Sequence, residues 1–244
     1  MSVEKKLLHY IGQAIGHYRL IHSGDRILVG VSGGKDSWTL LDILRKLQKR
    51  TRVIFKLKVG IVDFGFFNAK PLLEWLEGAE IEYEVLKAKL AFGNYKNTPC
   101  VLCSRLRRGI LYTYAKEQRY NKLALGHHRE DLNVSLLMSI FYNGKIASMP
   151  PKWVTPSGVT VIRPMIYCQE QDIIKYADQQ KFPLLLNNCP LKGHLGSRER
   201  VNSWLEMIIK DNSKVASNIL RAMQNLHPDH LADKRWWSFY EEDA

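Results

Sequence analysis

The chain of 244 residues carries 36 Lys and Arg residues against 24 Asp and Glu residues, a formal charge of +12. Hydrophobic residues make up 45% of the chain, which is enough for a core and excludes a disordered or fibrous protein. No apolar run approaches the roughly 18 residues that cross a bilayer, and the first residues lack the apolar block of a signal peptide. We therefore expect a cytoplasmic protein, away from membranes, whose charge favours a polyanionic partner.

The first half of the chain alternates helical and extended patterns. Leu7, Ile11 and Ile15 recur at helical spacing and predict an amphipathic helix near the start. Short apolar runs that are typical of buried strands then alternate with amphipathic helical patterns. The expected strands span residues 26–31, 55–62, 82–86 and 122–125, and the expected helices span 37–49, 70–76, 105–119 and 131–141. This alternation predicts an α/β fold with a doubly wound parallel sheet.

The second half is less regular. Residues 143–157 hold three prolines and a glycine and predict a surface loop, which leads to a strand at 160–163 and a helix at 169–180. An irregular stretch at 182–196 precedes helical patterns at 198–209 and 215–226. We expect an N-terminal helix within 1–22, the α/β domain at 23–181, and a small helical C-terminal extension at 182–244.

One loop between a strand and a helix has the composition of an anion cradle. It reads Ser32-Gly33-Gly34-Lys35-Asp36-Ser37. Two glycines allow a tight turn, and the following helix presents unpaired N–H groups to an anion. A bare Gly-Gly pair would only be a turn, and the spacing is not that of a Walker loop. The hexamer resembles the PP-loop of the ATP-pyrophosphatase superfamily, and this resemblance implies that all six residues hold the phosphates of ATP.

A second polar block follows the strand at 122–125 and should lie at the same edge of the sheet. It contains Gly126, His127, His128 and Asp131. The histidines could simply cap the strand and Asp131 the next helix, but a carboxylate there can also hold Mg²⁺ against phosphates. In the superfamily the equivalent block lies beside the ATP phosphates. Asp63, at the end of the second strand, falls where relatives line the adenosine pocket.

Four cysteines offer metal ligands or redox partners. Cys100 and Cys103 form a Cys-x-x-Cys pair just ahead of an expected helix, and this spacing fits zinc, an iron–sulfur cluster or a redox disulfide. No second such pair completes a zinc site. Cys189, on a polar loop, is the better third ligand, whereas Cys168 lies in an apolar run and is expected in the core. Three thiolates would leave one coordination position open for chemistry.

Several longer blocks resemble the tRNA 2-thiocytidine synthetase family, TtcA-type, over roughly residues 10–231. The resemblance is carried by residues 100–112, 124–131, 141–145, 149–152, 162–168 and 222–226. It implies ATP, Mg²⁺ and a [4Fe–4S] cluster as cofactors, with Cys100, Cys103 and Cys189 as the cluster ligands. It also implies tRNA as substrate, a sulfur donor of the cysteine desulfurase type, and a homodimer as one oligomeric state.

The chain departs from the family pattern in two places. The loop after Asp63 is shorter than usual, which affects the expected contacts to adenosine. Near the third cysteine, the family often has a further cysteine where this chain has Leu186, so Cys189 has no local competitor. Three arginines beside the Cys-x-x-Cys pair are candidates to bind the RNA backbone: Arg105, Arg107 and Arg108. Arg198 and Arg200 could extend that surface.

The resemblance implies a reaction at cytidine 32 of the anticodon loop. ATP would adenylate O2 of cytosine, with Lys35, Asp36 and Asp131 as the catalytic residues, and sulfur from the cluster would then replace the AMP ester. Two other functions remain open from the sequence. One is another PP-loop tRNA-modifying enzyme, of the lysidine or thiouridine synthetase kind, and the other is a non-catalytic redox or RNA-binding module.

Overall fold

The computed structural model describes residues 1–65, 68–89, 99–185, 196–233 and 235, and the side chains of 99–102 are not included. Its core is a six-stranded sheet in the order β3-β2-β1-β4-β6-β5. All neighbours pair in parallel except β5, which runs antiparallel to β6. The strands are β1 (Arg26–Gly30), β2 (Lys56–Asp63), β3 (Tyr83–Lys87), β4 (Lys122–Ala124), β5 (Lys152–Val154) and β6 (Thr160–Ile162). The predicted α/β class is confirmed.

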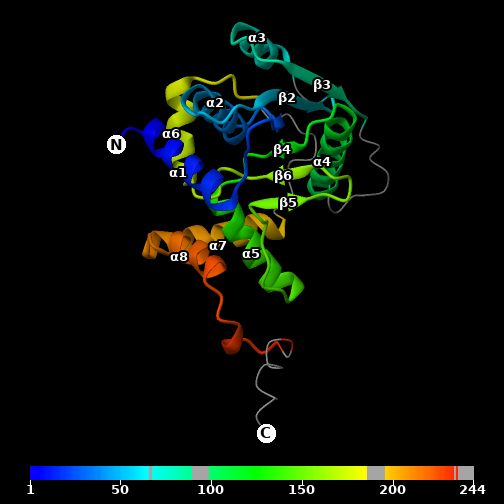
Figure 1. Cartoon of the computed structure of the whole chain (residues 1–244). Coiled ribbons are helices and arrows are strands. Elements are labelled where there is room, and N and C mark those ends of the chain that lie inside the picture. Colours follow the sequence, from blue (N-terminus) through cyan, green and yellow to red (C-terminus); the bar gives the residue numbers. More distant parts are fainter. Residues whose placement is uncertain (66–67, 90–98, 186–195, 234, 236–244) are drawn as a thin grey trace.

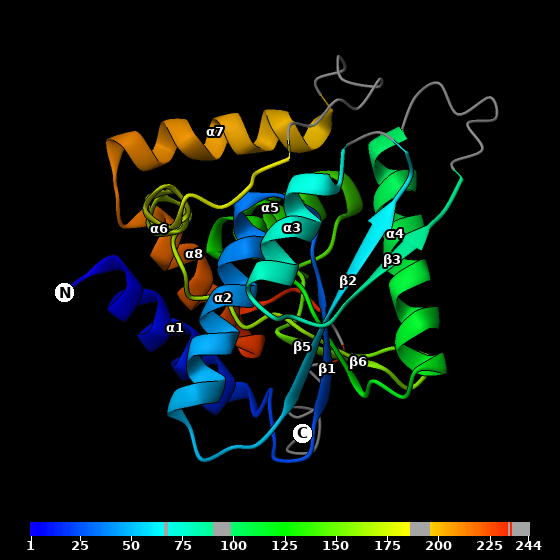
Figure 2. The same ribbon diagram turned by 90° about the horizontal axis from the view of Figure 1, so that it is seen from above.

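Helices cover both faces of this sheet (Figures 1 and 2). One face packs against α1, α2, α3 and α6, and the other face packs against α4. Outside these layers, α5 makes a further small core with α7 and α8. The helices are α1 (Val3–Tyr18), α2 (Lys35–Arg50), α3 (Lys70–Gly78), α4 (Pro99–Glu117), α5 (Arg129–Asn143), α6 (Glu170–Gln180), α7 (Ser197–Asp211) and α8 (Val215–Gln224), with a 3-10 turn at Pro228–His230.

The order of the strands creates a switch point between β1 and β4. From β1 the chain moves outward through β2 to β3, whereas β4 and β6 lie on its other side. Loops that leave the carboxyl ends of β1 and β4 therefore lead to strands on opposite sides, β2 and β6, and run in opposite directions across the sheet. This divergence opens a crevice, where doubly wound sheets bind their ligands.

Two sequence predictions about local structure were wrong. The loop expected at 143–157 contains β5, whose three residues are all exposed at the sheet edge and so carry no alternation of apolar and polar positions. The helix expected to begin at Arg105 begins at Pro99, so the Cys-x-x-Cys pair lies within its first turns. No helix in the described ranges is long and apolar enough to cross a membrane.

Candidate ATP and sulfur-transfer site

The PP-loop joins β1 to α2 and is folded by its own serines. Ser32 donates its backbone N–H to Ser37 Oγ at 3.2 Å, and Ser37 Oγ donates to the carbonyl of Gly34 at 2.9 Å. Gly34 is the N-cap of α2 and supplies no side chain to the first N–H groups of the helix. These N–H groups are therefore available to an anion, as helix N-termini in phosphate loops are.

Gly33 allows the chain at Leu185 to cross the PP-loop closely. Its φ of +82° lies in the left-handed region, and a Cβ there would lie 2.4 Å from Leu185 Cδ1. Leu185 also donates its backbone N–H to the Gly33 carbonyl at 3.0 Å. Glycine is thus required at position 33 by its conformation as well as by the neighbouring side chain.

Gly126, after β4, lies directly against the first turn of α2. A Cβ on Gly126 would lie 2.9 Å from the carbonyl oxygen of Asp36 and 3.1 Å from the backbone nitrogen of Ser37. Both are backbone atoms, which cannot rotate away as a flexible side chain can. The glycine therefore sets the close distance between the two polar blocks that the sequence predicted at this edge.

Replacing Gly126 by Ala should force these two segments apart. We expect the free energy of unfolding to fall by about 1–3 kcal/mol, the usual cost of overpacking, and ATP binding to weaken. Gly12 in α1 is the matched control, because a Cβ there meets nothing within 4 Å and Gly12→Ala should stabilise the helix by about 0.5–1 kcal/mol. Urea unfolding and equilibrium dialysis measure both quantities. Equal stability of the two variants would contradict this packing.

The two blocks line one cavity of about 370 Å³ at the switch point. From the PP-loop it receives Ser32, Asp36 and Ser37, and from the second block Gly126, His127 and Asp131. Helix α4 closes the cavity with Cys103, Ser104, Arg107 and Arg108. A loop that can cradle phosphates and one cysteine of the Cys-x-x-Cys pair therefore share a single cavity.

The three arginines that follow the Cys-x-x-Cys pair in the sequence lie in different environments. Arg107 and Arg108 line the cavity, whereas Arg105 is exposed and does not. Within the described part of the chain, the buried Nε of Arg107 has no hydrogen-bond partner, and its guanidinium lies 5.7 Å from the centre of the Phe64 ring. A buried donor without an acceptor is costly.

The described cysteines also lie in different environments. Cys103 lines the cavity, whereas Cys168 is fully buried in the core between β6 and α6, as predicted, and burial raises the pKa of its thiol. The side chain of Cys100 and the whole of Cys189 lie outside the described residues, so their roles as cluster ligands stay predictions. Asp63 ends β2, but its carboxylate accepts a hydrogen bond from the N–H of Gly65 at 2.7 Å, and it does not line the cavity.

Lys35 is held between two carboxylates. Its Nζ lies 3.0 Å from Asp36 Oδ1 and 2.9 Å from Oε1 of Glu170, the first residue of α6. Burial lowers the pKa of Lys35, but Asp36 and Glu170 outweigh it and the pKa is raised, so the ammonium stays charged. Glu170 was not predicted as a site residue. Its place in the first turn of the helix that follows β6, at the ligand edge, was the available signal.

His128 brings the two aspartates of the site together. Its Nε2 lies 3.8 Å from Asp36 Oδ1 and 3.4 Å from Asp131 Oδ2. Burial lowers the pKa of His128, but Glu130, Asp131 and Asp36 outweigh it and raise the pKa. Asp131 also accepts the backbone N–H of His128 at 3.2 Å, so it stabilises the start of α5 as well. No group of three or more candidate metal ligands occurs among the residues that the structure describes.

Arg198 reaches into the site from α7. Its Nη2 lies 2.6 Å from Asp131 Oδ1, so this residue, expected on an RNA-binding surface, pairs with a carboxylate that lines the cavity. Arg129, which lies within the block that follows β4, pairs with Glu130 at 2.7 Å and does not line the cavity. Both arginines therefore compensate carboxylates, and Arg107 and Arg108 remain as the arginines that line the cavity.

His127 is neutral at pH 7. Burial, and next the nearby Arg163, lower its pKa to about 4. Its Nδ1 accepts a hydrogen bond from Arg163 Nε at 3.3 Å, which leaves the ring proton on Nε2. Arg163 is itself buried and donates through Nη1 to the carbonyl of Pro150 at 2.6 Å. The imidazole therefore serves as a hydrogen-bond donor through Nε2 rather than as a cation.

The low pKa of His127 predicts a loss of stability in acid. The unfolded histidine takes a proton near pH 6.5 and the folded one only near pH 4, so the free energy of unfolding falls as pH drops through this window, by about 3 kcal/mol in total. His127→Gln should flatten this acid limb in urea titrations from pH 7 to 4. His128→Gln is the control, because its raised pKa gives the opposite sign. An unchanged slope in His127→Gln would contradict the assignment.

Comparison with known proteins agrees with this arrangement. A family model described as a PP-loop domain matches residues 2–186. The tRNA-cytidine(32) 2-sulfurtransferase of Coxiella burnetii strain CbuG_Q212 is 47% identical, with 98% of this chain and 96% of that protein covered. The protein of the same name from Legionella pneumophila strain Corby is 45% identical over 98% of this chain and 87% of its own.

A solved structure shares the fold. The U34-tRNA thiolase NcsA from Methanococcus maripaludis, solved with its [4Fe-4S] cluster, superposes with a TM-score of 0.75 over 93% of this chain and 80% of that one. Its sequence identity is 19%, so this likeness concerns the fold alone. The PP-loop between β1 and α2, together with two relatives matched over nearly their full length, gives the family: the chain belongs to the tRNA-cytidine(32) 2-sulfurtransferases of the PP-loop superfamily.

Proposed function

We propose that this protein replaces the 2-keto oxygen of cytidine 32 in the tRNA anticodon loop with sulfur, at the expense of ATP. One observation carries the proposal: Ser32 and Ser37 of the PP-loop line the same cavity as Cys103. A PP-loop enzyme that joins an amine to its substrate has no use for a thiol there, whereas a thiolase needs both. The name shared by relatives at 45–47% identity supports this substrate.

The cavity fits the polyphosphate of ATP. The N–H groups at the start of α2 have no side-chain acceptor from the N-cap, and the hydroxyl of Ser32 and the guanidinium of Arg107 line the cavity as further donors. Asp36 and Asp131, which approach the same imidazole nitrogen of His128, would hold Mg²⁺. This ion usually takes one or two carboxylates and completes its shell with phosphates and water.

Cys100, Cys103 and Cys189 would hold a [4Fe–4S] cluster. Cys103 fits this role because it lines the cavity, and thiolates are the ligands that such clusters take. Cys168 does not fit, because its buried thiol has a raised pKa. When held by these three cysteines, the cluster would supply the sulfur for the exchange.

The chain's own residues would prepare the carbonyl for exchange. In the first step O2 of cytosine bonds to the α-phosphorus of ATP while the bond to the pyrophosphate oxygen breaks, which turns a poor leaving group into AMP. Lys35 and Arg107 offset the charge that builds on the departing pyrophosphate. His127 is neutral and can donate a hydrogen bond through Nε2. It would therefore stabilise a negatively charged oxygen in the cavity without repelling a nearby cation.

The proposal includes a sulfur donor of the cysteine desulfurase type, a homodimer and a cytoplasmic setting.

Mass spectrometry of tRNA nucleosides tests the central claim. A strain without the gene should lack 2-thiocytidine and should regain it with the wild-type gene but not with Lys35→Met. A normal 2-thiocytidine level together with the loss of lysidine or of a thiouridine would refute the proposal and redirect the assignment.

A further inference from the structure

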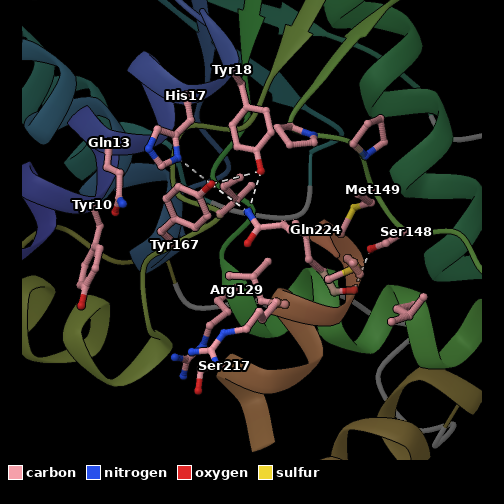
Figure 3. A pocket seen from close by; sticks show the side chains of 18 of the residues that line it. Tyr10, Gln13, His17, Tyr18, Arg129, Ser148, Met149, Tyr167, Ser217 and Gln224 are labelled. Carbon is pink, nitrogen blue, oxygen red and sulfur yellow. Dashed lines mark hydrogen bonds between the residues drawn. The ribbon is translucent and has the colours of Figure 1, made fainter. Parts of the chain in front are cut away.

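A second and larger cavity, of about 870 Å³, lies between α1, α5 and α8 and the loop that precedes β5 (Figure 3). It shares no lining residue with the ATP cavity. The proposed reaction assigns it no role. Its volume is within the roughly 300–1,000 Å³ that is usual for pockets that bind small organic groups.

Aromatic side chains with fixed hydroxyls form one end of this cavity. Tyr167 donates its hydroxyl to that of Tyr18 at 3.1 Å, and Gln224 Nε2 donates to both hydroxyls, at 2.8 and 2.9 Å. His17 Nδ1 lies 3.2 Å from the hydroxyl of Tyr167. These contacts hold residues of α1, α8 and the segment before α6 together, as Figure 3 shows. The ring faces and polar tips are therefore ordered before a ligand binds.

All the Asp, Glu, Lys or Arg residues that line the cavity are positively charged. Arg129 and Arg221 are among its lining residues, and none of the lining residues is an aspartate or glutamate. Arg129 pairs with Glu130, but Arg221 is exposed and makes no ion pair within the described ranges. Figure 3 shows Arg129 and Ser217 at the end of the cavity away from Tyr18. The cavity thus combines aromatic ring faces with the positive charge of Arg221.

Arg163 forms a physical link between the two cavities. Its Nη1 donates to the carbonyl of Pro150, which lines the second cavity, and its Nε donates to His127, which lines the ATP cavity. One buried side chain therefore touches the walls of both.

We propose that the second cavity binds an unpaired nucleotide of the anticodon loop, separate from the cytidine that reacts. This inference rests on the proposed function. Single-stranded RNA is recognised by stacking of splayed bases on aromatic rings and by arginine contacts to phosphate. Tyr10 and Tyr18 supply ring faces, Gln13 supplies an amide for a base edge, and Arg221 supplies the charge for the phosphate.

Binding of a fluorescein-labelled anticodon stem-loop RNA by the full-length protein tests this proposal. Arg221→Ala should raise Kd about 5- to 10-fold and lower the slope of log Kd against log salt by about one. Lys175→Ala removes an equal charge from an exposed position of α6 away from the cavity and should change Kd less than about 2-fold. Tyr10→Ala should abolish the fluorescence change of 2-aminopurine at one loop position. Both ATP affinity and the far-UV circular dichroism should stay at the wild-type level in Arg221→Ala.

Equal RNA affinity of Arg221→Ala and Lys175→Ala would overturn the proposal. So would a change in molar mass of Arg221→Ala by light scattering with RNA affinity unchanged, which would make the cavity an interface between two copies. A second bound AMP lost only in Arg221→Ala, again with normal RNA affinity, would assign the cavity to a free nucleotide. Failure of the proposed function is distinct, because the wild-type protein itself would then form no 2-thiocytidine.

Discussion

Replacing Lys35 by Met should lower kcat/KM for ATP by about 10²- to 10³-fold, the usual cost of removing one donor that stabilises transition-state charge. The physical reason lies in its two partners. Asp36 and Glu170 lie 3.0 and 2.9 Å from Nζ, so the variant leaves two carboxylates without their cation. Incoming phosphates would then meet net negative charge where the wild type presents a lysine. Pyrophosphate release in the presence of tRNA measures the effect.

Lys46→Met is the matched control for this variant. Lys46 lies on the same helix, its side chain is 26% exposed like that of Lys35, and it pairs with Glu4 at 2.9 Å and with Asp42 at 3.1 Å. Its removal therefore breaks an equivalent ion-pair network away from the PP-loop. We expect Lys46→Met to lose stability but to keep kcat/KM within about 2-fold. A similar loss of turnover in both variants would mean that Lys35 acts through stability alone.

Glu170→Gln separates positioning from charge. In the absence of ATP, Glu170 holds Lys35 beside Asp36, and phosphate would replace it as the partner of Nζ. Removing this competitor should tighten ATP binding a few-fold, because one unit of negative charge leaves the site. A weaker affinity would show instead that Glu170 must hold Lys35 in place for ATP to bind.

The part of the site that lies on two loops could be predicted from the sequence. The PP-loop and the block at Gly126 each follow an apolar run, and the carboxyl ends of parallel strands meet at one edge. Their local composition was therefore sufficient to place them together. In the structure Ser32, Asp36 and Asp131 line one cavity, as this argument expects of residues at one edge.

The partners of these residues could not be predicted, because they are set by tertiary packing. Glu170 reaches Lys35 from a helix 135 residues away in the chain, and Arg198 reaches Asp131 from 67 residues away. Arg198 has no local pattern that distinguishes it from an ordinary surface charge, and the place of Glu170 in the first turn of α6 does not indicate which residue it pairs with. Arg163 is similar, since only the fold shows that a buried arginine connects His127 with Pro150.

The predicted bounds of helices and strands were wrong where the local sequence signals were weak or conflicting. The start of α4 was predicted six residues late, although Pro99 is a typical first residue of a helix. Strand β5 has three residues, all exposed, and it forms only because β6 offers an open edge. No alternation of burial could have marked it.

Replacing Cys103 by Ser should abolish cluster binding and reduce thiolation to less than about 1% of the wild-type rate, because iron–sulfur clusters are held by thiolates. ATP affinity should change less than about 2-fold, since serine differs from cysteine by one atom and the phosphate donors of the PP-loop are untouched. Anaerobic reconstitution followed by iron and sulfide analysis measures cluster content independently of activity. Equilibrium dialysis measures the ATP affinity of the same sample.

Cys168→Ser makes this experiment decisive, because the two thiols occupy opposite environments. Cys103 lines the cavity that also holds the PP-loop serines, whereas Cys168 is fully buried, with a pKa that burial raises. A buried neutral thiol behaves as a small apolar group, so Cys168→Ser should keep its iron and lose about 1–3 kcal/mol of stability for the buried hydroxyl. Retention of iron in Cys103→Ser together with its loss in Cys168→Ser would reverse the assignment. The cluster would then have to lie inside the core, at the segment between β6 and α6.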